Sequence, residues 1–158
     1  MSKVVCPGSF DPITFGHLDI IERASKLFDE VVIAVLVNKT KTTLFSVDER
    51  IEMIKEVTKK FKNVSVDSWS GLLVEYCANN NISMIVKGLR AVSDFDYELQ
   101  MSQINLQLKG IETIFMSTSP VHSFLSSSLV KEIANYGGDV SNYVPAEILS
   151  RLKTRLAR

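Results

Sequence analysis

Short apolar runs alternate with longer segments of helical period along residues 3–118. The run VVIAVLV at residues 31–37 is the clearest, because it has no polar residue on either face of a strand. Such a strand needs helices on both faces of its sheet. A strand in a sheet with one solvent-exposed face would instead alternate apolar and polar residues. The pattern therefore predicts βαβ units and a parallel sheet.

The apolar runs and the helix signals predict an α/β fold. Strands are expected at residues 3–6, 31–37, 64–68, 84–87 and 113–117. Helices are expected at residues 17–28, after a Ser46/Glu49 capping box, after a similar Ser93/Asp96 pair, at 127–136, and from Pro145 onward. The expected architecture is a Rossmann-like doubly wound parallel sheet of about five strands with flanking helices and a C-terminal helical segment. No linker divides residues 1–158, so a single domain is expected.

Composition argues against several classes of function. Lys and Arg together number 18, as do Asp and Glu, so no net charge attracts nucleic acid or an anionic membrane. Cys6 and Cys77 lie in apolar stretches without further ligands nearby, which predicts buried thiols and neither a disulfide nor a protein metal site. No stretch is long enough to span a membrane, and a soluble, cytoplasmic protein is expected.

The segment CPGSFDPITFGHLDII at residues 6–21 joins the first predicted strand to the first helix. Ligands of open parallel sheets bind beyond the carboxyl ends of the strands, and a helix start offers unpaired N–H groups to an anion. Gly8 and Gly16 let a phosphate approach the main chain, and His17 would donate a hydrogen bond to it. A lone histidine at a helix start is more often a surface residue. Neither a dinucleotide glycine fingerprint nor a P-loop is present.

Four motifs resemble one protein family. PGSFDP at residues 7–12 with TFGH at 14–17 resembles the (H/T)xGH signature of the nucleotidyltransferase superfamily. KGLRA at 87–91, SDFDYE at 93–98 and FLSSSLVKE at 124–132 resemble the bacterial phosphopantetheine adenylyltransferases in order and spacing. The four motifs span nearly the whole chain.

The resemblance implies a single nucleotidyltransferase domain that transfers AMP from ATP to 4′-phosphopantetheine, giving dephospho-coenzyme A and pyrophosphate. It also implies Mg²⁺ as the cofactor, a homohexamer, and coenzyme A as a product-like or feedback ligand. No nucleic-acid or membrane partner is expected.

The site residues implied by the resemblance fall into three groups. The catalytic residues are His17 and Ser9. The ATP-binding residues are Ser9, Phe10, His17, Gly88, Leu89, Arg90, Glu98, His122, Ser123, Phe124, Leu125, Ser126, Ser127 and Ser128. The substrate-binding residues are Ser9, Lys41, Leu73 and Lys87. Three positions depart from the family pattern, which commonly has threonine at Ser9, arginine at Lys87 and an aromatic residue at His122.

Other interpretations remain open for single residues and for the whole chain. Lys41 can be a solvated loop lysine, Glu98 an exposed helix carboxylate and Leu73 a core residue. The acceptor can be another phosphate, such as nicotinamide mononucleotide or glycerol phosphate. Relatives acting on the mononucleotide tend to carry an arginine shortly after the serine run, and SSSLVKE has none. A nucleotide-binding module without turnover is the alternative outside enzymes.

Overall fold

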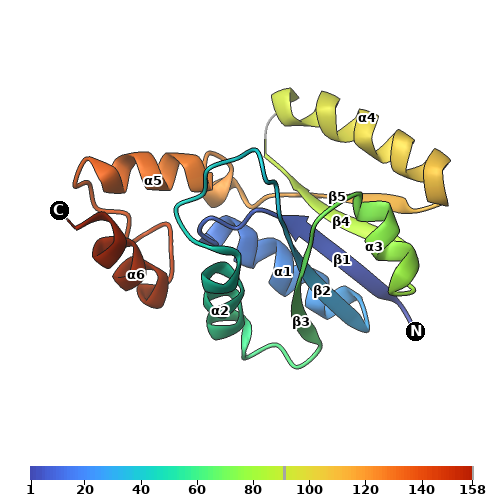
Figure 1. Ribbon diagram of the computed structural model, residues 1–158, viewed down its shortest axis with the longest axis horizontal. Coiled ribbons are helices and arrows are strands. Elements are labelled where there is room, and N and C mark those ends of the chain that lie inside the picture. Colours follow the sequence, from blue (N-terminus) through green and yellow to red (C-terminus); the bar gives the residue numbers. More distant parts are fainter. Residues whose placement is uncertain (91, 158) are drawn as a thin grey trace.

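The computed structural model describes residues 1–90 and 92–157, and the side chains of residues 92–94 lie outside this description. Within these residues, five strands form one parallel sheet in the order β3-β2-β1-β4-β5 (Figure 1). They are β1 (Lys3–Gly8), β2 (Glu30–Leu36), β3 (Val64–Trp69), β4 (Met84–Leu89) and β5 (Glu112–Ser117). The predicted strands and the Rossmann-like α/β class are confirmed.

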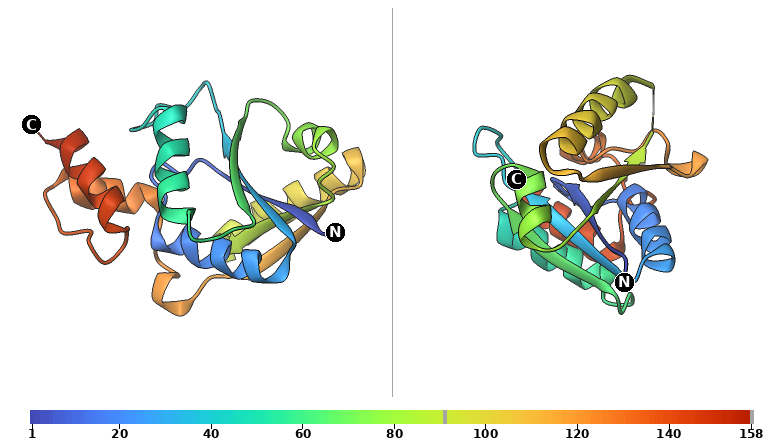
Figure 2. Two further views of the ribbon diagram at one scale, coloured as in Figure 1. Left: turned by 90° about the horizontal axis from the view of Figure 1, so that it is seen from below. Right: turned by 90° about the vertical axis from the view of Figure 1, so that its right-hand side faces the viewer.

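Helices cover both faces of the sheet. They are α1 (Phe15–Leu27), α2 (Val47–Thr58), α3 (Leu73–Asn79), α4 (Val92–Lys109), α5 (Ser127–Asn135) and α6 (Ala146–Leu156), with a 3₁₀ turn at Pro120–His122. Figure 2 shows α1 and α4 on opposite sides of the sheet. Helices α5 and α6 pack together at one end of the molecule, where the chain ends. In the described part of the chain, no helix is both long and apolar enough to cross a lipid bilayer.

Strand β2 shows why the two-sided apolar run predicted helices on both faces. Ile33 and Val35 belong to a core cluster with residues of α1, α2, α5 and α6. Val32 and Ala34, on the other face of the strand, belong to a second cluster with residues of α3. Both faces of β2 are therefore buried, and β-branched residues are favoured in such a strand.

Side-chain caps fix where several helices begin. Thr14 caps α1, so that helix starts at Phe15, two residues before the predicted start. The predicted capping box between Ser46 and Glu49 is confirmed at α2. Gly137, with φ of 79°, follows the end of α5, as expected of a glycine that stops a helix. Of the predicted Ser93/Asp96 box, the Ser93 side chain lies outside the described residues, and α4 begins at Val92, one residue before the predicted cap.

The C-terminal helix is present as predicted, and one helix was missed. In α6, Ile148 and Leu152 are fully buried, and Pro145 occupies the cap position directly before the helix. The missed helix, α3, has only seven residues, and its N-cap Leu72 makes no side-chain cap hydrogen bond. The sequence therefore lacks both the length and the cap that mark a helix start.

The strand order determines where a ligand can bind. The chain leaves β1 to build β2 and β3 on one side, and then returns to add β4 and β5 on the other side of β1. The connections above β1 and β4 therefore diverge, which opens a crevice at the carboxyl ends of these two strands.

Candidate active site

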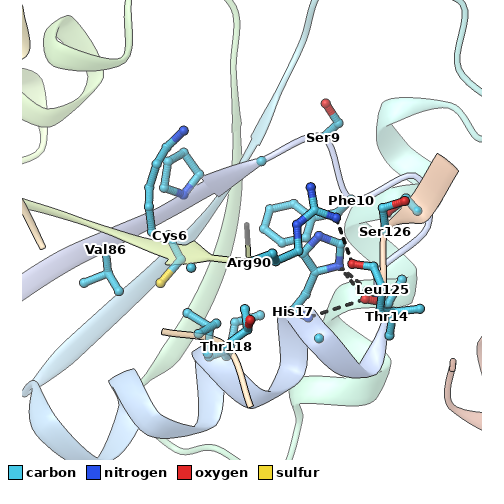
Figure 3. Close-up of a pocket in the computed structure, with 18 of the residues that line it drawn as sticks. Cys6, Ser9, Phe10, Thr14, His17, Val86, Arg90, Thr118, Leu125 and Ser126 are labelled. Carbon is cyan, nitrogen blue, oxygen red and sulfur yellow. Dashed lines mark hydrogen bonds between the residues drawn. The ribbon is translucent and has the colours of Figure 1, made fainter. Parts of the chain in front are cut away.

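A cleft of about 500 Å³ lies at this crevice (Figure 3). Its walls come from the end of β1, the start of α1, the end of β4 and the start of α5. Among the residues predicted from the sequence, it is lined by Ser9, Phe10, His17, Lys41, Lys87, Gly88, Arg90, Glu98, Leu125, Ser126, Ser127 and Ser128. The fold thus brings together residues from five separate segments: the bend from β1 into α1, the loop before α2, the end of β4, α4 and the start of α5.

The His17 ring is fixed by the cap of α1. The Thr14 main-chain N–H donates to His17 Nδ1 at 3.0 Å, while the Thr14 hydroxyl accepts from the His17 N–H at 3.4 Å. Because Nδ1 accepts a hydrogen bond, the proton of the neutral ring is on Nε2. The edge of the ring also contacts the Phe10 ring, with 5.0 Å between the centroids. The cap therefore holds His17 as an Nε2–H donor on the wall of the cleft.

Two effects keep His17 uncharged in the ligand-free protein. Burial of the ring, and to a smaller extent the positive charge of Arg90, lower its pKa from 6.5 to about 4. Figure 3 shows the Arg90 side chain beside the ring. A neutral imidazole donates one hydrogen bond from Nε2 and accepts one at Nδ1, which matches the geometry described above.

This shift is measurable by NMR titration. In the ligand-free protein, the ring carbon proton of His17 is expected to keep one chemical shift from pH 8 to about pH 5 and to titrate near pH 4. Since the unfolded chain takes up the proton near pH 6.5, the contribution of this residue to stability falls as the pH drops from about 6.5 to 4. The chain has two histidines, so His122→Ala assigns the signals. A midpoint near 6.5 would contradict the burial argument.

The bend before α1 holds Ser9 and Phe10 in a specific conformation. The buried side chain of Arg50, in α2, donates from Nη1 to the Ser9 carbonyl oxygen at 2.8 Å. In a trans peptide the C=O and N–H groups point in opposite directions, so the Phe10 N–H points away from Arg50. Phe10 has a left-handed φ of 50°, which is uncommon for a residue with a bulky side chain.

Gly8 is required by the same bend. A Cβ atom at this position would lie 3.1 Å from the Phe10 ring, closer than carbon atoms normally pack. The Phe10 ring is itself buried, so it has little room to move away. A side chain at residue 8 would therefore displace the ring that contacts His17.

The basic residues of the cleft have partners of different kinds. Lys87 Nζ lies 2.8 Å from Glu98 Oε2, and both side chains are partly buried. Arg90 Nη1 donates to the Leu125 carbonyl oxygen at 2.8 Å, which ties the end of β4 to the start of α5. Lys41 lies in the exposed loop between β2 and α2. Three cations from two segments, the loop before α2 and the end of β4, therefore border one cleft.

The three serines at the start of α5 make different contacts. The Ser126 hydroxyl accepts the Leu129 N–H at 3.1 Å and caps the helix. The Ser127 hydroxyl donates to the Pro12 carbonyl oxygen at 2.7 Å, which joins α5 to the bend. Ser128 is exposed and lines the cleft. The first turn of α5 thus presents main-chain N–H groups at the cleft.

Five predicted site residues do not line the cleft. Leu73 packs against the core cluster beneath α3. His122 stacks on Phe15, with 6.3 Å between the ring centroids. The Ser123 hydroxyl donates to the Pro120 carbonyl oxygen, and the exposed Phe124 contacts Tyr143 edge to face. Leu89, the last residue of β4, accepts hydrogen bonds from Thr118 through its carbonyl oxygen. Their predicted ligand contacts remain predictions.

Several residues that shape the cleft were missed by the sequence analysis. Thr118 follows β5 and lines the cleft, and a hydroxyl residue directly after a strand is a signal that could have been used. Cys6 also lines the cleft, but burial raises the pKa of its thiol to about 12, so it stays protonated. Cys6 and Cys77 are both buried and unpaired, as predicted.

Asp11 was also missed by the sequence analysis. Its carboxylate is buried and accepts hydrogen bonds from the Leu44 and Phe45 N–H groups, both at 2.9 Å. Lys131 Nζ donates to the same carboxylate at 2.9 Å. This one side chain therefore joins the bend after β1, the loop before α2, and α5.

The described residues include no group of three or more His, Cys, Asp or Glu side chains placed to hold a metal ion. Glu98, the carboxylate that lines the cleft, is paired with Lys87. The side chains of the cleft suit anions, and a divalent cation that arrives bound to nucleotide phosphates needs no such group of ligands.

Comparisons with known proteins agree with a nucleotide-transferring cleft. The model of the cytidylyltransferase-like family matches residues 5–133. A structure from Vibrio parahaemolyticus, assigned as a nicotinate-nucleotide adenylyltransferase, has a TM-score of 0.67 and 17% identity over 99% of this chain and 95% of that chain. At this identity the likeness concerns the fold. The fold and the cleft define a nucleotidyltransferase of the cytidylyltransferase-like class.

Curated relatives define the family more closely. The phosphopantetheine adenylyltransferase of Frankia casuarinae is 62% identical over the whole of both chains. That of Streptomyces coelicolor is 60% identical over 99% of this chain and 98% of its own. The chain belongs to the phosphopantetheine adenylyltransferase family.

Proposed function

We propose that the protein transfers the adenylyl group of ATP to 4′-phosphopantetheine and releases pyrophosphate, the penultimate step of coenzyme A synthesis. The observation that carries the proposal is a neutral His17, held as an Nε2–H donor in a cleft bordered by Lys41, Lys87 and Arg90. Membership of the family along the whole chain supports the choice of acceptor.

The reaction needs no activated side-chain nucleophile. A phosphate oxygen of 4′-phosphopantetheine attacks the α-phosphorus of ATP, and the bond from that phosphorus to the β-bridging oxygen breaks, so its electron pair leaves with pyrophosphate. The second pKa of such a phosphate is about 6, so the acceptor is already an anion at neutral pH. The protein has to align two anions and stabilise the charge that builds up on the α-phosphate.

His17 is proposed to donate from Nε2 to an α-phosphate oxygen in the transition state. Because the Thr14 N–H fixes the ring, this donor needs no reorientation during the reaction. The Ser9 hydroxyl and the Phe10 N–H, which the Arg50 contact turns away from α2, are proposed to bind phosphate oxygens beside it. His17 is thus a fixed hydrogen-bond donor and not a general base.

The two substrates are proposed to occupy different sides of His17. Lys41 and Lys87 bind the phosphate of 4′-phosphopantetheine, and Glu98 holds Lys87 in place through their ion pair. Arg90 and the first turn of α5 bind the triphosphate of ATP, together with Ser127 and Ser128. Mg²⁺ is proposed to enter as part of the ATP complex, bound by the phosphates. The ATP contacts of Leu89, His122, Ser123 and Phe124 and the pantetheine contact of Leu73 are kept as predictions.

The proposal extends to assembly, location and product. Helix α4 and strand β5 expose several large apolar side chains, which supports association into the homohexamer expected from the family. These are Phe95, Tyr97, Leu99, Ile104, Leu106, Leu108 and Ile114. Coenzyme A, which shares the pantetheine arm, is proposed to bind the same cleft. The proposed location is the cytoplasm, and residues 1–158 are proposed to form one domain.

A pyrophosphate-release assay tests the function. With ATP and Mg²⁺, 4′-phosphopantetheine is expected to support turnover, whereas nicotinamide mononucleotide and glycerol phosphate are expected to give none. Turnover with another acceptor would retain the chemistry and exclude the proposed substrate. No turnover with any acceptor, while ATP still binds, would favour a binding module.

A further inference from the structure

The loop between β2 and α2 carries Lys41 and is anchored at both ends, first by the Val37 N–H, which donates to the Trp69 carbonyl oxygen at 2.9 Å, and then at Leu44 and Phe45. Residues 38–42 are exposed, whereas Phe45 is buried in the core. The exposed part contains a local turn, in which Asn38 Oδ1 accepts the Thr40 N–H at 3.0 Å and the Lys41 N–H reaches the Asn38 carbonyl oxygen. Lys41 lies four residues after Val37 and three before Leu44, so its position depends in part on how the main chain at Leu44 and Phe45 is anchored.

The main chain at Leu44 and Phe45 is anchored from two sides. On the inner side, Asp11 accepts both N–H groups. On the outer side, Arg155 of α6 donates from Nη1 to the Leu44 carbonyl oxygen at 2.7 Å. The Phe45 carbonyl oxygen accepts from the Thr43 hydroxyl at 2.9 Å. Every main-chain polar group of these two residues thus has a partner.

Arg155 makes two further contacts at the same place. Its guanidinium carbon lies 5.0 Å from the centroid of the Phe45 ring, within the range of a cation–π contact. Its Nη2 forms an ion pair with Glu49, which also accepts the Ser46 N–H in the capping box of α2. Because one planar guanidinium makes all three contacts, the end of α6 is set against the base of the loop.

We infer that Arg155 is a positioning residue for the acceptor: by clamping Leu44 and Phe45, it sets the reach of Lys41 into the cleft. This inference rests on the proposed function, in which Lys41 binds the phosphate of 4′-phosphopantetheine. Helix α6 lies outside the cleft, and Arg155 is separated from Leu44 by 111 residues of sequence. The C-terminal helix thus contributes to acceptor binding through the loop and not by contact with substrate.

Arg155→Ala tests the inference in steady-state kinetics. The KM for 4′-phosphopantetheine is expected to rise about fivefold or more, the loss expected when a charge-assisted hydrogen bond is removed. The KM for ATP and kcat are expected to change less than about twofold, because neither depends on the loop. Arg155→Lys, which keeps the charge, is expected to recover part of the loss.

Arg151→Ala is the matched control. Arg151 lies one turn earlier in α6, is similarly exposed, and pairs with Glu52 and Glu56 of α2 without reaching the loop. Its replacement is expected to leave both KM values unchanged. If it raises the KM for 4′-phosphopantetheine as much as Arg155→Ala does, the effect comes from general loosening of α6, and the inference is wrong.

A double-mutant cycle decides whether Arg155 acts through Lys41. Once Lys41→Ala has removed the phosphate contact, adding Arg155→Ala is expected to change the KM for 4′-phosphopantetheine less than about twofold. Effects that multiply independently would overturn the inference.

Trypsin cleavage separates failure of the clamp from failure of the proposed function. The exposed loop contains Lys39 and Lys41. Arg155→Ala is expected to speed cleavage after these residues in the ligand-free protein, and Arg151→Ala is not. Unchanged cleavage in Arg155→Ala would exclude the clamp. Faster cleavage in a protein whose wild type does not turn over 4′-phosphopantetheine would keep the clamp and reject the substrate.

Discussion

His17→Ala is expected to lower kcat by a factor of about 10² to 10³, the usual cost of removing one fixed donor to a developing oxyanion. ATP binding, measured by calorimetry, is expected to stay largely intact, because the basic residues and the first turn of α5 remain. Steady-state pyrophosphate release gives kcat. Near-normal turnover would remove His17 from the transition state.

Two further substitutions separate catalysis from the cap, because His17 also forms the capping box of α1 with Thr14. Glutamine and glutamate both fit the third helical position of such a box. His17→Gln can accept the Thr14 N–H through its oxygen and still present an N–H to the cleft, so it is expected to retain part of the activity. His17→Glu keeps the cap and places a negative charge beside the phosphates, so it is expected to be as inactive as His17→Ala. If His17→Gln and His17→Glu have equal activity and equal thermal stability, the donor role of His17 is contradicted.

Asp11→Ala is expected to lower the free energy of unfolding by about 3 kcal/mol. The substitution leaves the buried Phe45 N–H and the partly buried Leu44 N–H without an acceptor, and a buried group of this kind costs about 1–3 kcal/mol. Lys131 adds less, because its side chain is partly exposed and can turn to solvent. For a chain of this length, the midpoint of thermal unfolding should fall by about 6–12 °C.

Asp139→Ala is the control for this measurement. Asp139 also accepts a main-chain N–H, from Ser141 at 2.9 Å, but it is exposed. Water replaces its carboxylate at no comparable cost, so the midpoint is expected to change little. Equal shifts for the two variants would show that burial of the Asp11 contacts does not matter.

The sheet could be predicted from the sequence because each strand carries its own signal. A run such as VVIAVLV predicts a strand and also predicts that helices cover both of its faces. Capping residues predict where helices start to within a few positions. Helix α3 could not be predicted in this way, since it is short and its cap is a leucine. Its helical conformation depends on Val74, Tyr76 and Cys77 packing onto the sheet, which is known only once the sheet exists.

The same limit applies to the site. The bend with His17 could be found because glycines, prolines and a histidine are adjacent in the sequence and resemble a known motif. Asp11, Arg50 and Arg155 act through partners 33 to 120 residues away. A single sequence contains no signal for such pairs. From the sequence alone, Arg50 of α2 therefore cannot be distinguished from the exposed polar residues of an amphipathic helix.

The left-handed Phe10 has a consequence for engineering a more heat-resistant version of this protein. Design schemes often replace non-glycine residues of positive φ with glycine, and here Phe10 and Asn81 both qualify. Asn81 is an exposed residue in the turn before β4, so the replacement there only relaxes the main chain. At Phe10 it would delete a buried ring that packs against His17, at a cost of about 3–5 kcal/mol that exceeds the relief of strain. Asn81 can therefore be replaced with glycine to raise stability, whereas Phe10 has to be kept because its ring packs against His17 in the cleft.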